Sequence, residues 1–152
     1  DFLTDSEVKN LKSSRFISQT IAIDAKAKDI YKVITDSIYA TRLGAGFNEK
    51  AIYDSDWNRD SKVVVKDATG VVLRTGRLTA VWPNLYIQID YNFDGVNYVE
   101  KLFLSSDEEG ESTELILVAG PFNDDFNEQK KSWNSWGYTL KGLSEQRKWI
   151  GI

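Results

Sequence analysis

The sequence predicts an α+β domain in which a curved antiparallel β-sheet wraps around one long C-terminal α-helix, with two short helices after the first strand. Three observations support this architecture. Residues 15–23 alternate in polarity, turn signals recur at hairpin intervals over residues 47–119, and apolar residues follow a helical period from Asn123. The chain has 152 residues, near the usual size of one domain. We therefore expect a single domain over 15–152, preceded by an N-terminal extension over 1–14.

The composition excludes several classes of function. The chain contains no cysteine and no histidine, which rules out Ser-His-Asp triads, Cys-His pairs and His/Cys zinc sites. Its formal net charge is -4, with 19 basic and 23 acidic residues interspersed, which argues against nucleic acid or anionic lipid as a partner. The apolar runs are far shorter than the roughly 20 residues of a membrane span. We expect no cofactor, no nucleic-acid partner and no membrane span, and we assign the cytoplasm by default.

The first part of the chain predicts a helix followed by a strand. Thr4 and Glu7 stand at the spacing of a capping box, which predicts a short helix over about 5–11. Residues 15–23 then alternate, with Ile17, Gln19, Ile21 and Ile23 on one side and Phe16, Ser18, Thr20 and Ala22 on the other. This alternation is typical of a half-buried strand.

Two short helices are expected next. Ile30, Val33 and Ile34 recur at helical spacing, which predicts a helix from about Lys26 onward. Asp36 is a suitable N-cap for a second helix, which we expect to end at the glycines of residues 44–46.

The turns of the meander set the register of its strands. Asp94-Gly95 is typical of a two-residue hairpin loop, and Pro83-Asn84 marks a second turn. The two turns pair Tyr91 with Tyr98, Ile89 with Glu100 and Ile87 with Leu102, and across the second turn Trp82 with Leu85, Ala80 with Ile87 and Leu78 with Ile89. One face of this sheet is almost wholly apolar, so it needs a covering element.

A long helix at the end of the chain can supply that cover. Its apolar stripe is formed by Phe126, Trp133, Trp136, Leu140, Leu143 and Ile150. The spacing predicts one helix of roughly 25 residues. Two charged residues, Glu100 and Arg74, share the parity of the helix-facing side chains. Because an unpaired buried charge costs several kcal/mol, they indicate a polar partner, a water-filled cavity or a rim, unless a bulge turns them toward solvent.

Short motifs give the chain a family resemblance. They comprise Ile21 to Asp36, Gly76-Arg77-Leu78 with Pro83 and Leu85, Ser112 to Leu117, and Trp136-Gly137 with Leu140 and Leu143. The set resembles the homologues of the activator of the heat-shock chaperone ATPase, within the START/polyketide-cyclase/pollen-allergen-like superfamily. The resemblance implies the helix-grip fold. It also implies an apolar small molecule between helix and sheet, as many superfamily members hold, or a co-chaperone role, as a narrower set has.

These observations favour a small hydrophobic molecule as the partner. Five Trp and seven Tyr tilt the choice toward a pocket, because their polar atoms need partners that a dry core rarely supplies. The candidate ligand-binding residues are Arg74, Leu78, Ile87, Ile89, Tyr91, Tyr98, Glu100, Leu102, Leu115, Leu117, Trp133 and Trp136. The alternative is a solidly packed core, since the same residues would fill one equally well.

Two further functions stay open at this stage. The chain could contact a chaperone or another protein through exposed tryptophans. The candidate anchors are Trp57, Trp82 and Trp149. It could also be a cyclase- or hydrolase-type enzyme in which Glu100 acts as general base while Tyr98 or Arg74 polarises a carbonyl.

Overall fold

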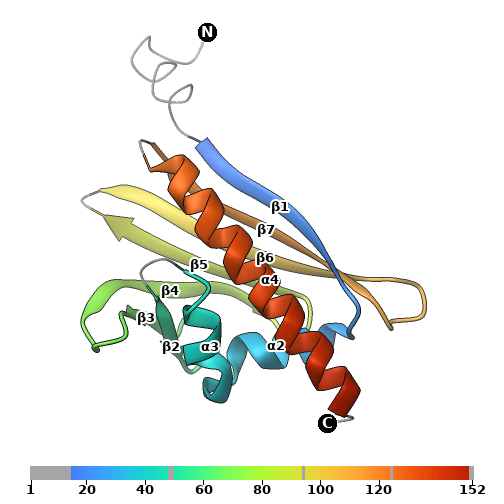
Figure 1. Cartoon of the computed structure of the whole chain (residues 1–152). Helices are drawn as coiled ribbons and strands as arrows, with labels where there is room; N and C mark the ends of the chain where they lie inside the picture. Colours follow the sequence, from blue (N-terminus) through green and yellow to red (C-terminus); the bar gives the residue numbers. More distant parts are fainter. Residues whose placement is uncertain (1–14, 48–49, 94, 124, 151–152) are drawn as a thin grey trace, which may run out of the picture.

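One antiparallel sheet curves behind a single long helix in the computed structural model, which describes residues 15–47, 50–93, 95–123 and 125–150 (Figure 1). The elements are β1 (Arg15–Ile23), α2 (Ala27–Thr35), η1 (Ser37–Tyr39), α3 (Ala40–Gly44), β2 (Ile52–Ser55), β3 (Lys62–Lys66), β4 (Val72–Trp82), β5 (Tyr86–Phe93), β6 (Val96–Ser106), β7 (Thr113–Phe122) and α4 (Phe126–Ile150). The predicted α+β architecture is confirmed. The helix expected over about 5–11 lies outside the described residues.

The sheet has seven strands in the order β1-β7-β6-β5-β4-β3-β2. The two edges are therefore β1 and β2, and the central strands carry the residues that face α4. On β1, Ile17, Ile21 and Ile23 are buried whereas the residues between them are mostly exposed, as the alternation predicted. Trp133, Trp136 and Leu140 of α4 are buried as well, and α4 packs against both β1 and α2. The core thus lies between this helix and the concave face of the sheet.

The register predicted for β5 and β6 is confirmed. Ile89 pairs with Glu100, and Tyr91 pairs with Tyr98. Because this pairing is set by the two-residue loop, it places the Glu100 side chain on the face toward α4.

The register predicted for β4 and β5 is only partly right. Leu78 does pair with Ile89, but Trp82 pairs with Tyr86 and Val81 with Ile87. The turn spans three residues, with Asn84 in the left-handed region at φ 66°. A bulge between Leu78 and Ala80 absorbs the extra residue and restores the predicted pairing further along the strand.

The two short helices pack beside α4 because of their caps and glycines. Asp36 accepts a hydrogen bond from the backbone N–H of Ile38 at 3.1 Å, as expected of a cap. A Cβ atom at Gly46 would lie 2.7 Å from the Cα atom of Trp136, so only glycine permits this close approach to α4.

An ion pair fastens this region to the end of α4. Arg147 Nε donates to Asp29 Oδ1 at 3.2 Å, and its Nη1 donates to the Tyr39 hydroxyl at 3.2 Å. The segment that opens α3 is therefore held in place. Within the described part of the chain, no helix is long and apolar enough to cross a membrane.

Candidate functional site

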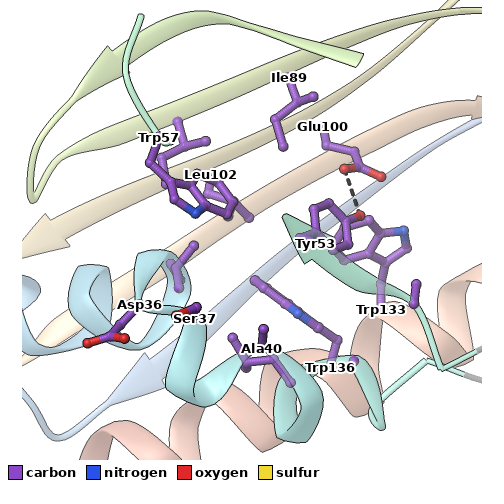
Figure 2. A pocket seen from close by; sticks show the side chains of 15 residues that line it. Asp36, Ser37, Ala40, Tyr53, Trp57, Ile89, Glu100, Leu102, Trp133 and Trp136 are labelled. Carbon is purple, nitrogen blue, oxygen red and sulfur yellow. Dashed lines mark hydrogen bonds between the residues drawn. The ribbon is translucent and has the colours of Figure 1, made fainter. Parts of the chain in front are cut away.

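A cavity lies between α4, α3 and the centre of the sheet (Figure 2). Its volume is about 40 Å³, enough for one or two water molecules. The lining residues are Ile34, Asp36, Ser37, Ala40, Leu43, Gly44, Ala51, Tyr53, Trp57, Ile87, Ile89, Glu100, Leu102, Trp133 and Trp136. Asp36, Ser37 and Trp57, which are half-buried or exposed, form its mouth.

Aromatic side chains from distant parts of the chain surround this space. Trp133 and Trp136 meet at an edge-to-face angle with ring centroids 5.4 Å apart. Phe47 packs against Trp133 at 4.9 Å and stacks near Tyr53 at 6.1 Å. Such contacts stabilise aromatic pairs beyond simple area burial. The aromatic side chains of the cavity wall are therefore held in place by one another where α4 meets the sheet.

Trp57 is held over the mouth by an unusual backbone. Its φ is 58°, in the left-handed region that bulky residues rarely occupy. The Trp57 N–H donates to Ser55 Oγ at 3.1 Å, which helps to fix the turn. Such a conformation costs on the order of 1–3 kcal/mol, and strain of this kind clusters at functional sites.

A buried carboxylate closes the inner end of the cavity. Glu100 is 3% exposed. Its Oε1 accepts hydrogen bonds from the hydroxyls of Tyr53 at 2.8 Å and Tyr91 at 2.9 Å, and its Oε2 accepts one from Tyr98 at 2.8 Å. Arg74 Nη2 lies 3.6 Å from Oε2 and donates to the Tyr53 hydroxyl at 3.1 Å. We refer to these five residues as the Glu100 cluster.

The cluster resolves the question that parity raised about Glu100 and Arg74. Both point inward, as predicted, and each is the other's charge partner. Burial, followed by the nearby Glu100 charge, raises the pKa of Tyr53, Tyr91 and Tyr98 above the usual value for tyrosine. All three hydroxyls are thus protonated at neutral pH and can donate to the carboxylate.

The predicted site residues fall into three groups. Six of them line the cavity: Ile87, Ile89, Glu100, Leu102, Trp133 and Trp136. Arg74, Tyr91 and Tyr98 instead hold Glu100 from behind. Leu78, Leu115 and Leu117 are fully buried core residues that do not line the cavity. The alternation along the strands correctly identified the side chains on the face of the sheet toward α4, but the cavity occupies only part of that face.

Sequence reasoning missed the other side of the cavity. Tyr53 and Trp57 come from the short strand β2 and the irregular loop after it, where periodicity is too brief to assign a face. Asp36 and Ser37 stand at the predicted cap of the second short helix and Ala40 lies within that helix, so the local pattern assigns none of them to a site. The one available signal was an aromatic residue in a polar turn, since Trp57 stands among aspartates and asparagine.

The geometry of Glu100 bears on the idea that it is a general base. Both of its oxygens already accept hydrogen bonds from tyrosines, and Arg74 adds a charge contact. A general base needs a lone pair directed at a substrate proton, so this arrangement suits an anchoring role better. Among the described residues, no group of three or more acidic side chains could hold a metal ion.

The architecture defines a helix-grip fold, and solved structures share it. Protein MLL2253 of Mesorhizobium loti superposes with a TM-score of 0.71 at 15% identity, covering 87% of this chain and 98% of that one. The Aha1 dimer of Colwellia psychrerythraea gives 0.69 at 15% identity, covering 86% and 96%. DynU16, from the dynemicin biosynthetic locus, gives 0.68 at 12% identity, covering 86% of this chain and 47% of its own.

These likenesses establish the fold, and they agree with the resemblance found in the sequence motifs. No family model matches the chain, and no curated protein matches it at a significant level. Function must therefore be argued from the site.

Proposed function

We propose that this domain binds a small apolar or aromatic molecule in the cavity between α4 and the sheet. The observation that carries this proposal is the ring of four aromatic side chains, Tyr53, Trp57, Trp133 and Trp136, around a space that opens at one end. Ligand sites are typically concave and mostly apolar, with a few placed polar groups. Here Tyr53 and Glu100 supply the polar groups at the inner end.

The cavity must widen to admit such a molecule. Its volume of about 40 Å³ is well below the roughly 300–1,000 Å³ of pockets for drug-sized ligands. Trp57 is the side chain best placed to move, because it lies half-buried at the mouth on a loop and pairs with no strand. Relief of its left-handed backbone would offset part of the energy that opening requires.

Native mass spectrometry tests the proposal directly. The protein is titrated with a panel of aromatic and aliphatic small molecules, and saturable one-to-one complexes are expected. Ala40→Trp fills the mouth and should abolish them. Ala45→Trp is the matched control, because Ala45 is an exposed residue just past α3 that does not line the cavity.

Either of two results would refute the proposal. One is a panel in which no molecule gives a saturable complex. The other is an Ala40→Trp variant that folds and still binds as tightly as the unaltered protein. Circular dichroism and thermal melts of both variants establish that they fold.

A second candidate function, contact with a protein partner, rests on the outer face of the sheet. Trp82 is 62% exposed and Phe103 is 38% exposed. Tyr86 lies between them, 6.2 Å from the Trp82 ring and 6.3 Å from the Phe103 ring. Adjacent exposed aromatic residues are typical of binding surfaces.

The other two candidate anchors are less suited to this role. Trp57 lines the cavity mouth, and the side chain of Trp149 lies outside what the structure describes. Sedimentation velocity, together with ATPase assays of a purified heat-shock chaperone, tests the surface. Trp82→Ala should weaken self-association or ATPase stimulation, and the candidate fails if neither is observed with the unaltered protein.

A further inference from the structure

The charged residues that line the cavity are both acidic. Among the described lining residues, Asp36 and Glu100 carry carboxylates, and none is a lysine or arginine. A hydrogen bond from the Ile38 backbone is the main cause that lowers the pKa of Asp36, so this carboxylate is ionised at neutral pH. The mouth therefore carries a carboxylate, one oxygen of which is paired with Lys32 Nζ at 3.3 Å.

The cations that act on these two carboxylates are already engaged, Arg147 with Asp29 and Tyr39. Arg74 lies behind Glu100, 3.6 Å from its Oε2. Lys32 Nζ lies 3.3 Å from Asp36 Oδ2, outside the cavity. An anionic group that entered would have to leave water without gaining a cationic partner, which is strongly unfavourable.

The aromatic walls act in the same direction. The faces of Trp and Tyr rings carry negative potential, which attracts cations and repels anions. Tyr53, Trp57, Trp133 and Trp136 all contribute surface to the cavity. A protonated amine would therefore be attracted to these aromatic walls, whereas a carboxylate would be repelled.

We infer that the cavity is selective for charge: it accepts apolar molecules that are uncharged or carry a protonated amine, and it rejects those that carry a carboxylate. The inference rests on the proposed function, because it concerns the ligand of the same cavity. It excludes fatty acids and aromatic acids as ligands, although their apolar portions would suit the walls.

Three molecules with one ring system test this selectivity. Naphthylmethylamine, naphthylmethanol and naphthoate differ mainly in the charge that they carry at pH 7. Calorimetric titration at low salt should show the amine and the alcohol binding at least about tenfold more tightly than naphthoate, because a desolvated, unpaired carboxylate costs several kcal/mol.

Asp36→Asn isolates the contribution of the mouth. Asparagine keeps the oxygen that caps Ile38 but removes the charge. The ratio of amine to naphthoate affinity should fall about threefold, an effect of the size expected for a charge near the protein surface. Asp67→Asn is the matched control, because Asp67 also accepts from the backbone N–H two residues later, that of Thr69, and does not line the cavity. It should leave the ratio unchanged.

The outcomes separate this inference from the proposed function. If naphthoate binds as tightly as the alcohol, the charge selectivity is wrong while ligand binding stands. If Asp36→Asn and Asp67→Asn change the ratio equally, the selectivity arises from net charge and not from the cavity. If none of the three molecules binds at millimolar concentration, the proposed function fails for aromatic ligands, and the inference fails with it.

Discussion

Replacing Glu100 by glutamine should destabilise the domain strongly, although the two side chains have nearly the same shape. The amide keeps one oxygen that can accept from tyrosine, but it loses the charge beside Arg74. Glu100 is 3% and Arg74 is 14% exposed at the side chain. Breaking a buried pair costs about 3–5 kcal/mol, and because Arg74 is partly solvated we expect about 3 kcal/mol. For a domain of this size that lowers Tm by about 6–12 °C.

Urea unfolding followed by tryptophan fluorescence measures this loss. Glu114→Gln is the matched control, because Glu114 is an exposed strand residue on β7 and should change stability by less than about 0.5 kcal/mol. Tyr98→Phe removes a single donor to Glu100, so it should cost about 1–2 kcal/mol. If Glu100→Gln is as stable as the Glu114→Gln control, the buried charge pair contributes little to the stability of the domain, which would refute this prediction.

Four further predictions concern stability. The pKa of each tyrosine that donates to Glu100 is raised in the folded state. The free energy of unfolding should therefore keep its full value below about pH 10 and fall above it by about 4 kcal/mol per pH unit for the three groups together. Urea unfolding from about pH 9 to about pH 11 measures this loss. Gly76→Ala should cost about 2 kcal/mol, since its Cβ would lie 2.6 Å from the Tyr91 ring. Gly142→Ala, where a Cβ meets nothing within 4 Å, should instead stabilise α4 by about 0.5–1 kcal/mol in thermal melts. Gln19→Leu should also raise Tm, because both polar atoms of the Gln19 amide are buried without a hydrogen-bond partner.

Each of these has a result that would contradict it. Spectrophotometric titration at alkaline pH would show Tyr53, Tyr91 and Tyr98 ionising at about pH 10 if they were not protected. Equal effects of the two glycine substitutions would mean that contact with Tyr91 is unimportant. A lower Tm for Gln19→Leu would mean that this amide makes favourable interactions in solution.

The sequence predicted the strand pairing correctly where a single turn determines the register. The loop at Asp94-Gly95 set the pairing of β5 with β6, and with it the inward direction of Glu100. The turn that begins at Pro83 was predicted one residue too short, because a three-residue loop and a bulge offset each other. Neither feature leaves a clear mark in periodicity, since each moves the strand by only one residue.

The site was harder to predict than the fold. Parity identified which side chains face α4, but not how far the helix fills the concave face. Leu115 and Leu117 are therefore core, whereas Ile87 and Leu102, on the same face, reach the cavity. The partners of Glu100 were also hidden, because Tyr53 lies 47 positions away along the chain and on an edge strand.

The Glu100 cluster also favours the native strand register over shifted registers. Tyr53 comes from β2, Arg74 from β4, Tyr91 from β5 and Glu100 with Tyr98 from β6. A slip of two residues in any of these strands would keep its apolar side chains facing α4 but would move its member of the cluster out of position, leaving a carboxylate buried with too few donors. Misregistered sheets with the same apolar burial are thus penalised. The buried charge therefore helps to specify which of several similar sheets the chain adopts, in addition to anchoring the inner end of the cavity.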